Sequence, residues 1–439
     1  MFGMKFFVLA VFALSCVAKP TTRELYEEDL KLERQLKLVN KPSVKTVKTE
    51  YGDIYDCIDF YKQPAFDHAL LKSHEFHPEM RPSNMNGLEE VEKEEGNNEI
   101  EVECPHGTVP IRRTTKEDLI RQKTFNQMFD SNVHPLTNSE PGLHVNPTLY
   151  GDNRCRKFAY FHTRDQHCFN TNCPGFVVVN NNSPLDYAFP KVSEIAVRIM
   201  ECRFYIYRDP QNGNWWLFTG KGKKQKALGF WPAKLFTDLA YNADQVYWGG
   251  ELFTLPNSMT SPMGNGLLIK HVDDPRLYAY ARDCSVVDAK TQKVIGVADV
   301  NSEEVTDFDG WYGRRKAHIE KYWGHTIMFG GPAKLIKERC STAVVASARK
   351  VGVVLTAVIK HICPLILRKA CEAIKKCLQD KMTGERECYL ACHLSTKKRF
   401  MARELYPDSC PPPLSSSSSM SGVSMMLNVL SDRALMWKS

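Results

Sequence analysis

From residue 145 onward, short runs rich in β-branched and aromatic residues alternate with turn-forming residues, which is the chain's strongest constraint on fold. Asn212-Gly213, between two such runs, is a strong hairpin signal. Residues 232–243 begin with proline and place apolar residues at helical spacing, which predicts one helix. These patterns predict a mainly β fold, an antiparallel β-sandwich. The predicted strands lie at residues 157–162, 175–179, 194–208, 215–218, 246–252 and 266–270.

The N-terminus carries one lysine, then an uncharged apolar run that ends in small residues. This order predicts a secretory signal peptide at residues 1–18. The run is too short for a membrane span, and no other stretch is long and uncharged enough. We therefore expect a secreted protein, in the extracellular space or the vacuole, without integral membrane association.

Fourteen of the fifteen cysteines follow the predicted signal peptide, and in an oxidising compartment this number favours disulfides. Cys168 and Cys173 span an Asn-rich turn and are expected to pair. A metal cluster that adds His162 and His167 is the weaker alternative, so no metal site is predicted. Asn181 begins the one acceptable N-glycosylation sequon and lies in a polar turn.

Before residue 130 the pattern predicts a small α+β unit. Residues 21–39 fit a helix with a leucine-rich face, and residues 46–76 favour extended chain. Eight glutamates between residues 89 and 103 predict an exposed acidic segment. A capping box at residues 114–117 then opens a second helix that ends near residue 129.

The C-terminal part is basic. Residues 341–439 hold fifteen Lys/Arg and seven Asp/Glu, a net of +8 in a chain whose total is +7. No nucleic-acid recognition motif accompanies this charge, so we interpret it as a solvated surface and expect no nucleic-acid partner. Residues 343–378 predict two or three basic, cysteine-containing helices, and a Pro/Ser-rich linker follows at 411–419.

Several segments resemble the neprosin family. KTEYGDIYDCIDFYKQPAFDHALLK (48–72) and CPHGTVPIRRTTKEDLI (104–120) resemble its activation peptide, and NPTLYGD (146–152), GNWWL (213–217), LGFWPAKLF (228–236) and VYWGGEL (246–252) resemble its peptidase domain. This resemblance implies a plant glutamic endopeptidase made as a zymogen, in a family of which many members cut after proline. It also implies disulfides Cys57–Cys104, within the propeptide, and Cys168–Cys173.

The resemblance implies a propeptide at residues 19–130, a peptidase β-sandwich at 131–340 and a basic helical tail at 341–439. In the family a long strand-rich stretch precedes the first catalytic motif, whereas residues 129–140 form only a short polar join. We therefore expect a sandwich that is incomplete at its start. Two alternatives to an active enzyme follow: an inactive secreted binding protein of the same family, or a sequence that lacks an exon.

Two glutamates carry the chemistry in the family. Glu251 ends an intact Trp-Gly-Gly-Glu motif, whereas Glu140 lies in a motif where Pro141 and Leu143 replace a small residue and Trp. Paired carboxyls suit peptide hydrolysis because one takes a proton from water while the other, with a raised pKa, protonates the amide. We predict a Glu140/Glu251 dyad that acts on peptide or protein substrates at acidic pH, without a cofactor.

Three tryptophans, Trp215, Trp231 and Trp248, are candidates to line a substrate groove. At strand spacing, tryptophans more often pack in a core, which is the alternative. The sequence contains no nucleophile elbow, phosphate loop or dinucleotide fingerprint. It makes no prediction of oligomeric state.

Overall fold

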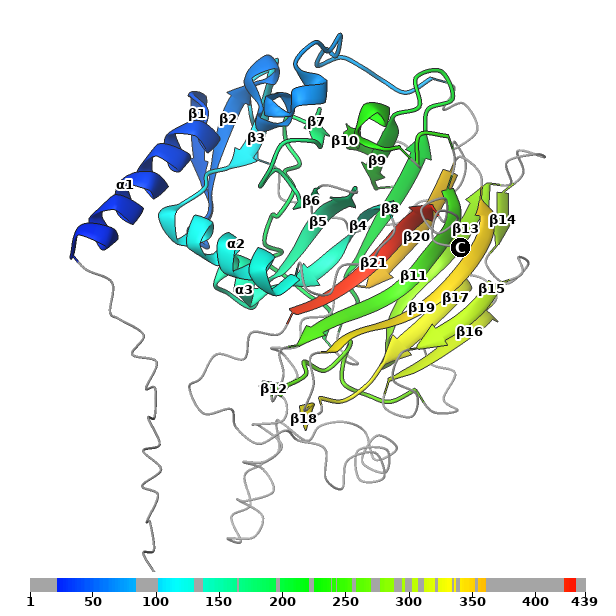
Figure 1. Cartoon of the computed structure of the whole chain (residues 1–439). Helices are drawn as coiled ribbons and strands as arrows, with labels where there is room; N and C mark the ends of the chain where they lie inside the picture. The colour runs from blue at the N-terminus through cyan, green and yellow to red at the C-terminus, as the bar shows by residue number, and fades with distance from the viewer. Residues whose placement is uncertain are drawn as a thin grey trace, which may run out of the picture.

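The computed structural model describes residues 22–83, 102–129, 422–431 and, apart from short gaps, 137–360. Two large antiparallel sheets pack on each other, and a smaller N-terminal unit of helices and three strands lies at one end of them (Figure 1). The predicted mainly β, antiparallel fold is confirmed. Within the described residues, no helix is both long and apolar enough to cross a membrane.

The N-terminal unit, residues 22–129, contains α1 (Thr22–Val39), a three-stranded sheet and α2 (Lys116–Phe129). Three short 3-10 turns follow the second strand, so the extended chain predicted over residues 46–76 covers only part of that segment. The helix predicted at 21–39 is confirmed. Most of the predicted acidic segment lies outside the described residues. The strands are β1 (Ser43–Lys48), β2 (Ile54–Asp59) and β3 (Thr108–Arg112), in the order β1-β2-β3, and the turns are Phe60–Lys62, Pro64–Asp67 and Ala69–Leu71.

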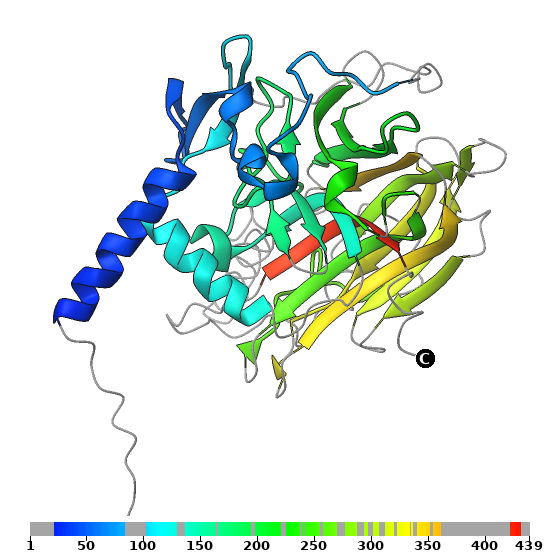
Figure 2. The ribbon, with the colours of Figure 1, turned by 45° about the horizontal axis from the view of Figure 1, so that its top comes forward.

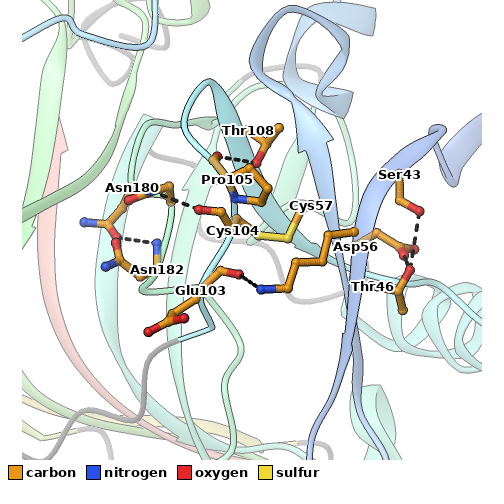
Figure 3. Close-up of a disulfide and its surroundings, with 12 residues drawn as sticks. Ser43, Thr46, Asp56, Cys57, Glu103, Cys104, Pro105, Thr108, Asn180 and Asn182 are labelled. Atoms are coloured by element: carbon orange, nitrogen blue, oxygen red, sulfur yellow. Dashed lines mark hydrogen bonds between the residues drawn. A yellow bond between two sulfur atoms is a disulfide. The ribbon is translucent and has the colours of Figure 1, made fainter.

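The disulfide Cys57–Cys104 ties β2 to the chain that enters β3, with a Cα–Cα distance of 5.4 Å (Figure 3). It confirms the predicted pair. Next to this disulfide, the Val102 backbone amide donates to the Asn182 carbonyl oxygen, and the Cys104 backbone amide donates to the Asn181 carbonyl oxygen. The disulfide therefore holds the N-terminal unit at a point where it bonds directly to the sandwich.

The capping box of helix α2 is formed by Thr115 and Asp118, one residue later along the chain than predicted. The Thr115 hydroxyl accepts from the Asp118 amide at 3.1 Å, and the Asp118 carboxylate accepts from the Thr115 amide at 2.9 Å. Asp118 takes the place of the predicted Glu117 because it lies three residues after Thr115, and its carboxylate also binds Arg121 and Arg112. Such reciprocal bonds satisfy amides that have no partner within the helix.

The seven-stranded sheet has the order β15-β19-β11-β21-β4-β5-β6. All its neighbouring strands are antiparallel. Its strands are β4 (Thr137–Val145), β5 (Cys155–His162), β6 (His167–Phe169), β11 (Ala243–Thr254), β15 (Ser302–Thr306), β19 (Cys340–Val351) and β21 (Gly422–Ser431).

The nine-stranded sheet has the order β16-β17-β13-β20-β8-β9-β10-β7, with β14 paired to β13. A separate short pair joins β12 (Ser258–Met259) to β18 (Leu335–Ile336). The nine strands are β7 (Val177–Val178), β8 (Glu201–Arg208), β9 (Trp215–Thr219), β10 (Lys226–Trp231), β13 (Ala279–Val287), β14 (Val294–Gly296), β16 (Gly313–Ile319), β17 (Gly324–Gly330) and β20 (Val354–Lys360).

Strand β9 is buried along its whole length. One side of this sheet meets the other sheet, while Phe76 of the N-terminal unit packs edge-on against Phe230 of β10, with ring centroids 4.9 Å apart. Covering both faces explains why the run Trp215–Thr219 is almost uninterruptedly apolar. The predicted hairpin is also confirmed, since β8 and β9 pair around Gly213, whose φ of 75° favours glycine.

Three local predictions in this region are wrong. Residues 232–243 form only a 3-10 turn, Ala233–Leu235, because Ala243 already starts β11. Residues 266–269 form no strand, since Gly266 adopts a φ of 77° in a turn. The strand predicted at 194–208 begins only at Glu201.

The helices predicted from residue 343 are wrong where the structure describes this segment. Residues 340–360 form β19 and β20, and residues 422–431 form β21. Valine and threonine are frequent in these stretches, and β-branched residues favour strands. All three strands occupy internal sheet positions (Figure 1), so pairing on both sides stabilises them. The remaining tail cysteines and the Pro/Ser-rich linker lie outside the described residues.

Candidate active site

The two predicted catalytic glutamates lie on strands of the same sheet. Glu140 is on β4 and Glu251 is on β11, and β21 pairs with both strands from between them. Successive side chains of a strand point to opposite faces. Leu143 of β4 and both Trp248 and Leu252 of β11 belong to the core between the sheets. The two glutamates therefore project from the other face.

Strand register places both carboxyl groups on one face. Ser424 of β21 pairs with Glu251 on one side and with His144 on the other. Directly opposite residues of neighbouring strands share a face. Because His144 follows Glu140 by four residues, Glu140 shares that face as well.

The Trp-Gly-Gly-Glu motif has a structural reason at each position. Trp248 is fully buried in the core. At Gly250, a Cβ would lie 2.8 Å from the Phe329 ring of β17, so only glycine lets the two sheets approach this closely. Glu251, on the opposite face, remains partly exposed.

Gly249 of β11 and Gly142 of β4 place no side chain on the face that carries the two carboxyl groups. Both glycines pair with Met426 of β21, one from each side, so they lie in one row across the sheet. They are two residues from Glu251 and Glu140, respectively. At these two positions another extended backbone could approach β4 and β11 closely.

Glu140 is 5% exposed. Burial raises the pKa of its carboxyl group well above the ordinary value, and the negative charge of Glu251 raises it further. Glu140 therefore retains its proton in conditions where an exposed glutamate is ionised. Glu251 thus acts electrostatically on Glu140 across the intervening strand β21.

An aromatic cluster borders Glu140. Tyr160 of β5 is its cross-strand neighbour, and the rings of Tyr160 and Phe169 lie 4.5 Å apart. Phe125 of α2 packs edge-on against Phe169 at 5.7 Å. The last helix of the N-terminal unit thus covers part of the face that carries the glutamates (Figure 2).

The three candidate substrate-binding tryptophans are core residues in this structure. Trp215, Trp231 and Trp248 are each 0% exposed. Trp248 points away from the face of Glu251, and the Trp215 indole N–H donates to the Leu239 carbonyl oxygen at 2.8 Å. The prediction that they line a groove is wrong because strand alternation turns Trp248 inward and sheet packing covers the other two.

Cys168 and Cys173 form the predicted disulfide, with a Cα–Cα distance of 6.0 Å. His162 and His167 lie near it, with ring centroids 6.4 Å apart. No group of His, Cys, Asp and Glu in the described part of the chain could hold a metal ion. Asn181 is half-buried and its side-chain amide donates to the Cys104 carbonyl oxygen at 3.2 Å, so its glycosylation stays a prediction.

A buried charge network joins the N-terminal unit to β5. Asp53, in the turn between β1 and β2, accepts from Arg156 of β5 at 2.8 Å and from Arg112 of β3 at 3.0 Å. Arg156 also donates to the Asp186 carbonyl oxygen at 2.8 Å, and Tyr55 of β2 donates to the Asp186 carboxyl at 3.4 Å. We call these five residues the junction network.

The sequence offered only a weak signal for the junction network. Arg156 and Lys157 interrupt an otherwise apolar strand, and charged residues in such a run are rarely buried unless paired. Nothing local indicated their partners, because Asp53 lies about a hundred residues earlier in the chain and Asp186 lies in a loop.

The fold and site define a two-sheet β protein with paired carboxyl groups on one sheet face and a disulfide-tied N-terminal unit packed beside them. Comparison with family models matches residues 122–332 to Neprosin and residues 46–161 to the Neprosin activation peptide. The chain belongs to the neprosin family and combines a peptidase-like domain with an activation peptide. The two matches overlap over residues 122–161, so they set no sharp boundary between the parts.

Proposed function

We propose that this protein is the secreted zymogen of a glutamic endopeptidase that hydrolyses peptide bonds at acidic pH. The observation that supports this most is the buried carboxyl of Glu140, whose pKa is raised by burial and by the neighbouring charge of Glu251. A carboxyl pair that shares one proton provides an acid and a base in one site.

The different environments of the two glutamates support one division of roles between them. Glu140, buried and protonated, is the general acid that protonates the leaving amide nitrogen. Glu251, partly exposed, is the general base that takes a proton from the attacking water. The water oxygen bonds to the carbonyl carbon, the C–N bond then breaks, and the proton balance needs no metal or covalent nucleophile.

The substrate is an extended peptide or protein segment. Gly142 and Gly249 carry no side chain on this face, which supports the approach of a peptide backbone over β4 and β11. A preference for proline before the cut comes from the family alone. Two disulfides fit an exported protein, and we propose the extracellular space or the vacuole as its location, with a glycan on Asn181.

The direct test is a digestion assay on the secreted protein after cleavage between residues 129 and 140. A peptide mixture incubated between pH 3 and pH 6 should be cut, and mass spectrometry of the products should show proline before the cut. The activity should survive chelators and serine reagents. Loss of activity with either reagent would reject the carboxyl pair, whereas a folded, processed but inactive protein would support the binding-protein alternative.

The junction network makes a pH prediction for the latent form. Asp186 is 2% exposed, and burial raises its pKa to about 7, although Arg112 and Arg156 partly offset this. In an unfolded chain the carboxyl ionises near its ordinary value, so the folded form binds an extra proton. The latent protein therefore gains stability from this group as pH falls from 8 to 5. Asp186→Asn should reduce that gain by roughly 2 to 3 kcal/mol.

Denaturant midpoints at pH 8 and pH 5 measure this difference. Asparagine suits the test because it tolerates the φ of 55° found at Asp186. Asp67→Asn, at an exposed ion pair with Lys41, is the matched control and should keep the wild-type profile. An unchanged profile in Asp186→Asn would show that the junction network is not the pH-sensitive element. Because the protonated Asp186 carboxyl stabilises the latent protein at pH 5, this group holds the N-terminal unit on the sandwich at acidic pH. We therefore expect release of the unit to require cleavage of the chain.

A further inference from the structure

His144 occupies the face of the two glutamates and is almost completely buried. It is 1% exposed and follows Glu140 by four residues on β4. Its β21 neighbour, Ser424, is also the neighbour of Glu251. His144, Ser424 and Glu251 therefore stand in one row across three strands, and neighbouring strands are about 4.8 Å apart. A peptide group above Ser424 would lie over the strand between His144 and Glu251.

A chain of hydrogen bonds fixes which nitrogen of His144 carries the proton. The Ala159 amide donates to Asn170 Oδ1 at 2.8 Å, which orients the side-chain amide so that Asn170 Nδ2 donates to the Tyr150 hydroxyl at 2.9 Å. The Tyr150 oxygen thus accepts from Asn170, and its own hydrogen points to His144 Nε2 at 3.1 Å. Because Nε2 accepts, the proton of the neutral imidazole is on Nδ1.

The same surroundings keep the imidazole neutral and fixed in orientation. Burial, assisted by the positive charge of Arg156, lowers the pKa of His144 to about 3. Its ring stacks on Phe158, with centroids 4.6 Å apart and planes 21° apart, and lies 5.7 Å from Phe169. Packing on two sides prevents the ring from turning to find another partner.

His144 Nδ1 has no hydrogen-bond partner within the described part of the chain, although it is buried. An unpaired buried N–H group costs free energy, so such groups are rare in folded proteins. Here the unpaired donor belongs to a ring that a three-residue chain holds in one tautomer, on the face of the carboxyl pair.

We propose that His144 Nδ1–H donates a hydrogen bond to the carbonyl oxygen of the bond being cut. The proposal rests on the peptidase function proposed above. The bond becomes stronger when water attacks, because the carbonyl oxygen then takes up negative charge. His144 is therefore a catalytic residue that transfers no proton, while Tyr150 and Asn170 are positioning residues that fix its tautomer.

The test compares His144→Phe with Tyr150→Phe in the processed enzyme. His144→Phe keeps a ring but removes the donor, and kcat should fall about a hundredfold while KM changes less than threefold. Tyr150→Phe removes one hydroxyl and releases the tautomer, so kcat should fall about tenfold. Nitrogen-15 NMR of the wild type should show the proton on Nδ1, and Tyr150→Phe should show a mixture of tautomers.

The outcomes distinguish failure of the His144 proposal from failure of the proposed peptidase function. Activity within threefold of wild type in His144→Phe, together with inactivation by Glu251→Gln, would overturn the donor role and leave the peptidase intact. A wild-type proton on Nε2 would overturn it as well. If His144→Phe does not fold, Tyr150→Phe decides, because an unchanged kcat and tautomer would reject the proposal. Activity that is insensitive to Glu251→Gln would instead reject the proposed function.

Discussion

Replacing Glu251 with glutamine should lower kcat/KM of the processed protein by about a hundredfold or more. Glutamine keeps the shape of the side chain but removes the group that takes a proton from water. Glu140→Gln should cause a similar loss, because an amide N–H is too weak an acid to protonate the leaving nitrogen. The double variant should be little worse than either single variant, as expected for residues that act as a unit.

The pH profile distinguishes the two roles. Because the raised pKa of Glu140 keeps it protonated, activity should decline at higher pH as this group ionises. Glu194→Gln, at a loop carboxylate paired with Arg198, is the matched control and should retain full activity. Equal activity in Glu251→Gln and wild type would rule out the dyad, whatever the effect of Glu140→Gln.

Local patterns predicted elements that are stable for local reasons. The leucine-rich helix Thr22–Val39, the strand Trp215–Thr219 and the Asn212-Gly213 hairpin follow from periodicity and turn chemistry. The tail stretch 340–360 mixes helix-forming Ala and Lys with β-branched Val and Thr, so local propensity alone does not decide its conformation. Pairing with β8, β11 and β15, distant in sequence, decides its conformation instead.

The candidate site was predictable as residues but not as geometry. Motifs pointed to Glu140 and Glu251, but the assignment of acid and base depends on burial, which only the fold supplies. His144 carries no local signal, since its role follows from Tyr150 and Asn170. Trp248 was misassigned because position in a motif does not reveal which face of the strand it occupies.

Removing β21 should abolish activity and strongly destabilise the seven-stranded sheet. The strands that carry Glu140 and Glu251 do not pair with each other, and β21 bonds to both along nearly its whole length (Figure 1). Truncation after residue 421 would leave two unpaired strand edges inside the sheet, which also favour aggregation. We expect activity below one hundredth of wild type, on the order of the dyad variants, and a lower melting temperature. Truncation after residue 431, which retains β21, is the matched control.

A synthetic peptide of residues 422–431 makes this prediction specific. Added in excess to the truncated protein, it should occupy the vacant position and restore activity, because an extended peptide can add to a sheet through main-chain hydrogen bonds. The same peptide with Val429→Pro should fail, since proline removes a donor from a strand that is paired on both sides. Full activity in the protein truncated after residue 421 would mean that β4 and β11 position their glutamates without this strand. Rescue by the proline peptide would mean that the added segment acts elsewhere than between them.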